Sequence, residues 1–129
     1  MKNPAGANEV LRTLTLVDGQ IDLWLALNDG IADGRDVSWI WDADFERLAG
    51  RVRHVTCSGT RAEEMALRLK YAGIEAEAHV DRELGAALDH AVATGADDGR
   101  PLYALPTYTA LLELRDLLTR RGLAGRWAD

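Results

Sequence analysis

The residues best suited to chemistry in this sequence are gathered in one acidic stretch, residues 28–46. It holds five aspartates and two of the four tryptophans of the chain. Clustered carboxylates can bind Mg²⁺ or Ca²⁺, and a single carboxylate beside large aromatic side chains suits a protein interface. The stretch therefore raises three alternatives, which are a metal site, a structural loop, and a working carboxylate or partner surface.

Residue types alone do not choose among these alternatives. The aspartate spacing does not fit the pattern of a calcium-binding loop, which argues against a dedicated metal site. In the structural interpretation Asp42 caps a helix start, Asp33 and Gly34 form a turn, and Trp39 and Trp41 anchor the loop on the sheet. In the interface interpretation the same tryptophans form the centre of a contact surface.

Two shorter loops could hold an anion. Residues 58–61 read Ser-Gly-Thr-Arg, and their backbone N–H groups together with Arg61 could receive a phosphate or a carboxylate. Thr60 and Glu63 also fit a capping box, and Thr107 or Thr109 could cap a last helix in the same way. The loop at 58–61 has too few glycines for a dinucleotide fingerprint or a P-loop, so an ordinary capped helix is the simpler interpretation.

The remaining reactive side chains suggest no catalytic centre of their own. Cys57 is the only cysteine and follows a strand-like run, which predicts a small buried side chain. His54, His79 and His90 fall in separate elements, so we expect them to lie far apart and to be structural. No Ser-His-Asp or Cys-His arrangement is evident.

The elements around these loops predict an α/β fold. Apolar runs of strand length occur at 21–27, 52–57, 76–80 and 102–105, and stripes of helical period occur around 7–14, 62–69, 84–92 and 111–118. This alternation predicts a three-layer, mainly parallel sheet with helices on both faces. Loops 28–44, 58–61 and 106–109 should then lie along one edge, at the carboxyl ends of the strands.

Composition narrows the class of protein. Fifteen basic and twenty-one acidic residues give a net charge of −6, which argues against a nucleic-acid surface. No apolar run is long enough for a transmembrane segment, and no signal peptide opens the chain, so we expect a cytoplasmic protein. A chain of 129 residues fits one domain, residues 1–129.

Several strings resemble a known family. The Asn-Pro segment at 3–11 resembles the start of the C-terminal domain of Mur ligases. The string Asp-Val-Ser-Trp-Ile-Trp-Asp at 36–42, with residues 58–73 and 105–110, resembles the C-terminal domain of MurT, the ligase-like subunit of lipid II isoglutaminyl synthase. The resemblance covers essentially the whole chain and implies a Rossmann-like domain.

The resemblance also implies an activity for a larger assembly. In it, the complete ligase subunit uses ATP and Mg²⁺ to activate the α-carboxylate of D-glutamate in lipid II, at the inner face of the cell membrane. A class I glutaminase subunit supplies the ammonia that yields D-isoglutamine. The ATP-binding central domain with its P-loop is not in this sequence, so we expect residues 1–129 to be a fragment that is inactive alone and binds no cofactor tightly.

The family resemblance gives roles to particular residues. It implies an aspartate supplied to the Cys-His site of the glutaminase, for which Asp42 ranks first, followed by Asp36 and Asp44. From their residue type alone, Trp39 and Trp41 are the candidate interface residues. Weaker candidates for substrate or nucleotide contact are Asn3, Ser58, Thr60, Arg61, Thr107 and Tyr108. Two alternatives remain, a docking or lid module without catalytic residues and a free-standing nucleotide-binding α/β domain.

Overall fold

The computed structural model of the chain describes residues 1–95 and 99–122, and its centre is a four-stranded sheet in the order β3-β2-β1-β4. Every strand pairing among the described residues is parallel. The strands are β1 (Ile21–Ala26), β2 (Val52–Ser58), β3 (Ala78–Val80) and β4 (Leu102–Pro106). The predicted parallel sheet is therefore confirmed.

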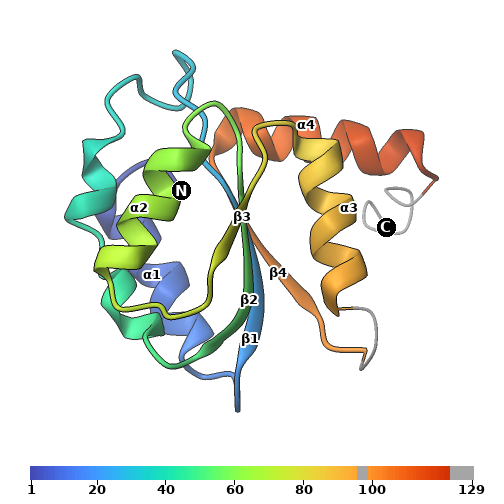
Figure 1. Ribbon diagram of the computed structural model, residues 1–129. Helices are drawn as coiled ribbons and strands as arrows, with labels where there is room; N and C mark the ends of the chain where they lie inside the picture. Colours follow the sequence, from blue (N-terminus) through green and yellow to red (C-terminus); the bar gives the residue numbers. More distant parts are fainter. Residues whose placement is uncertain (96–98, 123–129) are drawn as a thin grey trace.

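Helices cover both faces of this sheet (Figure 1). On one face lie α1 (Pro4–Leu14) and α2 (Ala62–Tyr71), together with two short 3-10 helices, η1 (Ser38–Trp41) and η2 (Phe45–Leu48). On the other face lie α3 (Leu84–Gly95) and α4 (Tyr108–Arg120). The three-layer, Rossmann-like α/β architecture predicted from the alternation of elements is confirmed.

Strand β1 explains why the apolar runs fold as they do. All six of its residues are buried, because it has a neighbour on each side and a helical layer on each face. Leu23 and Leu25 belong to the core beneath α1 and α2, whereas Trp24 and Ala26 pack with α3 and α4. This alternation is the period-two geometry of a strand, and it builds two separate cores.

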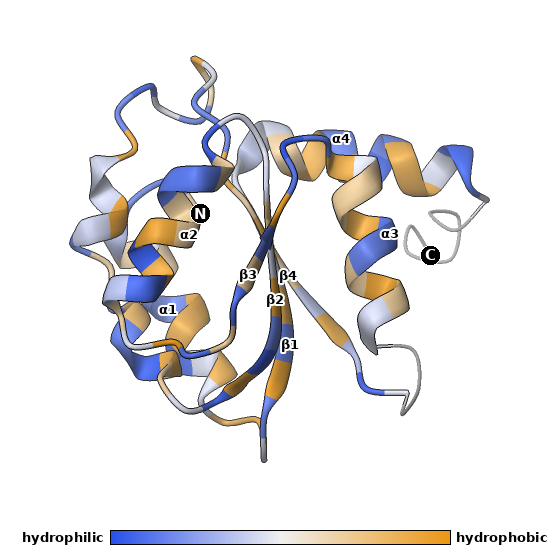
Figure 2. Cartoon of the chain, in the orientation of Figure 1, coloured by the Kyte–Doolittle hydropathy of each residue, from blue (hydrophilic) through white to orange (hydrophobic). Residues whose placement is uncertain are grey.

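Strand β3 is shorter than predicted. It begins at Ala78 instead of residue 76, because it pairs with β2 only from Val55 to Cys57. Near the N-terminus, Asn3 caps α1 by accepting a hydrogen bond from the Gly6 backbone N–H at 2.8 Å. Pro4 occupies the first position of this helix. The long segment between β1 and η1 extends beyond the sheet and is mostly hydrophilic (Figure 2).

Candidate functional site

The three candidate loops meet at the carboxyl ends of the strands, as predicted, and Asn28 joins them. Its backbone N–H donates to Thr107 Oγ1 at 3.0 Å, and its side-chain Nδ2 donates to Thr109 Oγ1 at 3.0 Å. Its Oδ1 accepts from the Thr60 backbone N–H at 3.0 Å. Since Asn28 is buried, this one side chain fixes the loops after β1, β2 and β4 relative to one another.

Asp33 is the most deeply buried carboxylate of this edge, with 2% of the residue exposed. It accepts hydrogen bonds from the Thr109 N–H at 2.7 Å and the Thr109 hydroxyl at 2.5 Å, and a third from the Gly30 N–H at 3.1 Å. Asp33 therefore caps the start of α4 from a loop that is distant in sequence. Thr107 occupies the N-cap position of α4, as predicted, but its hydroxyl makes no capping bond, because it faces Asn28 and Ala26 instead.

The predicted capping box after β2 is wrong. Arg61 occupies the N-cap position of α2 without a capping side-chain bond, and the Thr60 hydroxyl donates to Asp29 Oδ1 at 2.9 Å. Glu63 pairs with Arg82 at 2.8 Å instead of turning back on the helix. The Thr60 hydroxyl thus bonds to the loop after β1 and not to its own helix, because the two loops lie side by side at the edge of the sheet.

Residues 58–61 do not fit a phosphate in this conformation. The backbone N–H groups of Gly59, Thr60 and Arg61 already donate to Arg82 O, Asn28 Oδ1 and Leu27 O. The Arg61 guanidinium lies 3.4 Å from an Asp29 oxygen and 2.5 Å from a Glu64 oxygen. Two carboxylates beside one guanidinium leave no excess positive charge for an anion at this loop. Ser58 is fully buried at the end of β2.

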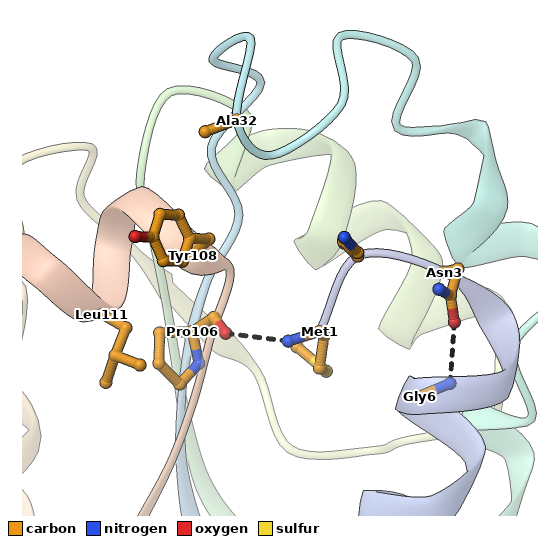
Figure 3. A pocket seen from close by; sticks show the side chains of 8 residues that line it. Met1, Asn3, Gly6, Ala32, Pro106, Tyr108 and Leu111 are labelled. Atoms are coloured by element: carbon orange, nitrogen blue, oxygen red, sulfur yellow. Dashed lines mark hydrogen bonds between the residues drawn. The ribbon is translucent and has the colours of Figure 1, made fainter.

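Asn3 and Tyr108 lie at a second feature of this edge, a cavity of about 570 Å³ (Figure 3). The N-terminal segment, Ala32 and the start of α4 line it. Tyr108 is 51% exposed, and the Asn3 side chain is engaged in capping α1. The cavity therefore brings together two of the weaker candidate residues that are remote in sequence.

The three candidate aspartates differ in their contacts. Asp36 is exposed, and its Oδ1 accepts a hydrogen bond from the Ser38 backbone N–H at 2.9 Å. This hydrogen bond, with a further one from the Ser38 side chain, lowers the pKa of Asp36 below its ordinary value. Asp44 Oδ2 accepts from Arg47 Nε at 2.8 Å. The exposed Asp42 carboxylate has no hydrogen bond or ion pair within the described part of the chain.

The structural interpretation of this stretch needs two corrections. Asp42 ends η1 as its C-cap and does not begin a helix, while Asp44 precedes η2 without a capping bond. Trp41 does not anchor the loop on the sheet, because it is 46% exposed. Trp39 is half-buried against the core, and the fully buried anchors of the segment are Ile40, Phe45 and Leu48.

Arg68 organises this stretch although no sequence motif singles it out. This α2 side chain is buried, and it donates to Ile40 O at 2.7 Å and Ala43 O at 2.8 Å. Two further bonds reach both carboxylate oxygens of Glu46 at 2.8–2.9 Å. The guanidinium also lies over the ring of Trp41, 5.4 Å from its centroid. Arg68 therefore fixes the path of residues 40–46 on α2.

The prediction that the histidines lie far apart is wrong for one pair. His79 of β3 and His90 of α3 stack with ring centroids 3.5 Å apart, although they are eleven residues apart in sequence. His54 Nδ1 lies 3.2 Å from the buried Asp22 carboxylate. Cys57 is fully buried, as predicted, and burial raises the pKa of its thiol to about 12.

Within residues 1–95 and 99–122, no group of three or more His, Cys, Asp or Glu side chains is placed to hold a metal ion. No helix in the same part of the chain is long and apolar enough to cross a membrane.

Comparison with known proteins identifies the family. The family model described as MurT ligase C-terminal matches residues 1–111. This chain belongs to that family. Two relatives, from Staphylococcus aureus strains COL and N315, are each 41% identical over 120 residues, which cover 92% of this chain and 26% of the relative. Both are named lipid II isoglutaminyl synthase (glutamine-hydrolyzing) subunit MurT.

A third relative, from Streptococcus pneumoniae (strain ATCC BAA-255 / R6), carries the same name. It is 37% identical over 123 residues, which cover 94% of this chain and 27% of that protein. The chain thus spans about a quarter of the length of the curated MurT relatives it matches. The matched segment includes all three loops at the carboxyl ends of the strands, residues 28–44, 58–61 and 106–109.

Proposed function

We propose that this MurT-family domain docks a glutaminase subunit and supplies an aspartate to its Cys-His site. In the proposed complex the ligase subunit uses ATP and Mg²⁺ to activate the α-carboxylate of D-glutamate in lipid II. Ammonia from glutamine then gives D-isoglutamine. The names of the MurT relatives, which specify a glutamine-hydrolysing synthase acting on lipid II, support this proposal.

The observation that carries the proposal is the state of the Asp36 carboxylate. It is exposed to a partner, and the Ser38 N–H holds one of its oxygens in place. A carboxylate has about four lone-pair sites, so it can still accept a hydrogen bond from an imidazole. Like any exposed aspartate it is ionised at neutral pH. An anion beside the imidazole fixes the tautomer and stabilises the imidazolium that forms during thiolate chemistry.

The contacts of the three aspartates favour Asp36, whereas the sequence placed Asp42 first. Asp44 is paired with Arg47, which competes for the charge that a partner imidazole would need. Asp42 is exposed but has no group that holds its carboxylate in one orientation among the described residues. Asp36 combines exposure with a fixed orientation, which favours it for the role in trans.

The test compares Asp36→Asn, Asp42→Asn and Asp44→Asn in the complete ligase subunit, mixed with its glutaminase. Asparagine at residue 36 can still accept from Ser38, so the loop should keep its shape while the charge is lost. We expect glutamine hydrolysis to fall by roughly 10²-fold or more in Asp36→Asn. Subunit binding, and amidation driven by ATP and added free ammonia, should persist in all three variants.

The outcomes separate the alternatives. Loss of subunit binding together with both activities would mean that the loop serves docking alone. Full glutaminase activity in all three variants would refute the role of this loop. A loss confined to Asp42→Asn or Asp44→Asn would support the same role with a different aspartate.

A further inference from the structure

We propose that Asp33 is a positioning residue, which fastens the Asp36 loop to the start of α4 and so sets where Asp36 meets the glutaminase site. The inference rests on the proposed function. Asp33 does not touch the partner in this proposal, because only 2% of it is exposed. It acts through the backbone that connects it to Asp36.

The contacts of Asp33 clamp two elements together. Its Oδ1 accepts from the Thr109 N–H at 2.7 Å, in the first turn of α4. Its Oδ2 accepts from the Thr109 hydroxyl at 2.5 Å and from the Gly30 N–H at 3.1 Å, within its own loop. A carboxylate accepts all three bonds at once, and charge-assisted bonds of this length are the strong class.

Only one assignment of donors and acceptors satisfies the hydrogen bonds around Asp33. The Thr109 hydroxyl donates its single proton to Asp33, so it must accept from Asn28 Nδ2. That orientation of the Asn28 amide points its Oδ1 at the Thr60 N–H. The chain of bonds therefore runs from the loop after β2 through Asn28 and Thr109 to Asp33, and each member orients the next.

The clamp lies close to Asp36 along the chain. The Asp33 N–H donates to Gly30 O at 3.0 Å, which closes the turn that precedes Gly34 at φ +90°. Beyond Asp36, the buried side chain of Val37 enters the core. The Asp36 backbone is thus held between two fixed points, Asp33 on α4 and Val37 in the core, while the rest of residues 29–36 is largely exposed.

This arrangement predicts a catalytic consequence. A displacement of about 1 Å at a reacting group can cost roughly 10²-fold in rate. Releasing Asp33 frees one of the two points that hold Asp36, so the carboxylate should spend less time in reach of the partner imidazole. The loss should appear in kcat for glutamine hydrolysis and leave KM for glutamine nearly unchanged, because Asp36 does not bind glutamine in this proposal.

The test uses Asp33→Asn, Thr109→Val and Thr109→Ser in the complete ligase subunit with its glutaminase. Asparagine places an NH₂ group against the Gly30 and Thr109 donors, and valine removes the hydroxyl at nearly constant shape. We expect kcat for glutamine hydrolysis to fall roughly tenfold or more in both. Serine keeps the hydroxyl and should restore most of the rate. Asp81→Asn is the matched control, because its bond to the Glu83 N–H needs only the oxygen that asparagine keeps.

A double-mutant cycle with Asp36→Asn separates positioning from a general loss of stability. If Asp33 acts through Asp36, adding Asp33→Asn to Asp36→Asn should lower the rate little further. An equal fold-loss in both backgrounds, or an unchanged kcat in Asp33→Asn and Thr109→Val, would overturn the inference. Full activity of Asp36→Asn itself would instead refute the proposed function, so the two failures are distinguishable.

Discussion

Single buried charges organise the acidic edge of this domain. Asp33 and Arg68 are both almost fully buried, and each is satisfied by groups from a segment far away in the sequence. Asp33 joins the loop after β1 to α4, and Arg68 joins residues 40–46 to α2. Buried charges are tolerated when they are fully hydrogen-bonded, and removing one partner is then costly. The main structural role of both residues is therefore to hold a loop in place, and they contribute less to the packing of the apolar core.

Replacing Arg68 by methionine should destabilise the domain. The change keeps an apolar stem but leaves the Ile40 and Ala43 carbonyls without their donors and Glu46 without its partner. We expect the free energy of unfolding to fall by about 3 kcal/mol, measured by urea denaturation. Arg47→Met is the control, because it removes only an exposed pair with Asp44 and should cost at most about 0.5 kcal/mol. Equal losses in the two variants would contradict this role for Arg68.

At the scale of elements, the approach of the loops depends on the tight turn between β2 and α2. Gly59 has φ +93°, and a Cβ atom there would lie 2.6 Å from both Leu27 O and Asn28 Oδ1. The first of these is backbone and cannot move without shifting β1. Only glycine lets the loop after β2 pass this close to the end of β1, which is what allows Asn28 to reach the Thr60 N–H.

Gly59→Ala should therefore cost more than an ordinary glycine replacement in a left-handed conformation. Gly50 has φ +76° with nothing near its missing Cβ, so Gly50→Ala should lose about 1–2 kcal/mol of unfolding free energy from backbone strain alone. Gly59→Ala adds a steric clash with backbone and should lose roughly 3 kcal/mol or more. Thermal unfolding of both variants measures the difference, and similar losses would mean that the loop yields easily.

At the scale of the whole molecule, the two ends of the sheet carry different groups of polar residues. The carboxyl end carries the candidate site, whereas the opposite end holds a buried ion pair. There Asp22 of β1 accepts from Arg53 Nε at 2.9 Å and has His54 Nδ1 at 3.2 Å. A Cβ on Gly95 would lie 2.8 Å from an Asp22 oxygen, so the end of α3 closes over the pair. The amino end of the sheet thus serves stability.

This ion pair predicts a dependence of stability on pH. The hydrogen bond from Arg53 lowers the pKa of Asp22 below its ordinary 3.8. The unfolded chain therefore takes up this proton at a higher pH than the folded chain. The stabilisation is fully present above about pH 3.8 and is lost as the pH falls through the lower pKa of the folded state.

Asp22→Asn should weaken this acid limb, which is the fall of the unfolding free energy as the pH is lowered. Urea denaturation between pH 5 and pH 2 should show a smaller loss of unfolding free energy on acidification than the unsubstituted domain shows, from a lower stability at neutral pH. Asp18→Asn, at an exposed aspartate, should leave the acid limb unchanged. An unaltered acid limb in Asp22→Asn would mean that other carboxylates, such as Glu46 paired with Arg68, dominate acid unfolding.

The sequence by itself determined the fold class, the four strands, the meeting of three loops at one edge, and the family. Apolar periodicity reports which face of an element is buried, and strand direction in a parallel sheet decides which loops share an edge. The string at 36–42 carried the family resemblance because its order of tryptophans and aspartates is specific, whereas a periodic apolar pattern is shared by many unrelated folds.

Only the tertiary structure decided the partners of the polar side chains. Thr60, Thr107 and Asp42 have the local signature of helix caps, yet Thr60 and Thr107 bond to the loop after β1 and Asp42 ends a 3-10 helix. Asp33 caps a helix 76 residues away from it in sequence. A hydroxyl or carboxylate takes the donor or acceptor that the sheet order brings within about 3 Å, and local sequence does not encode that distance.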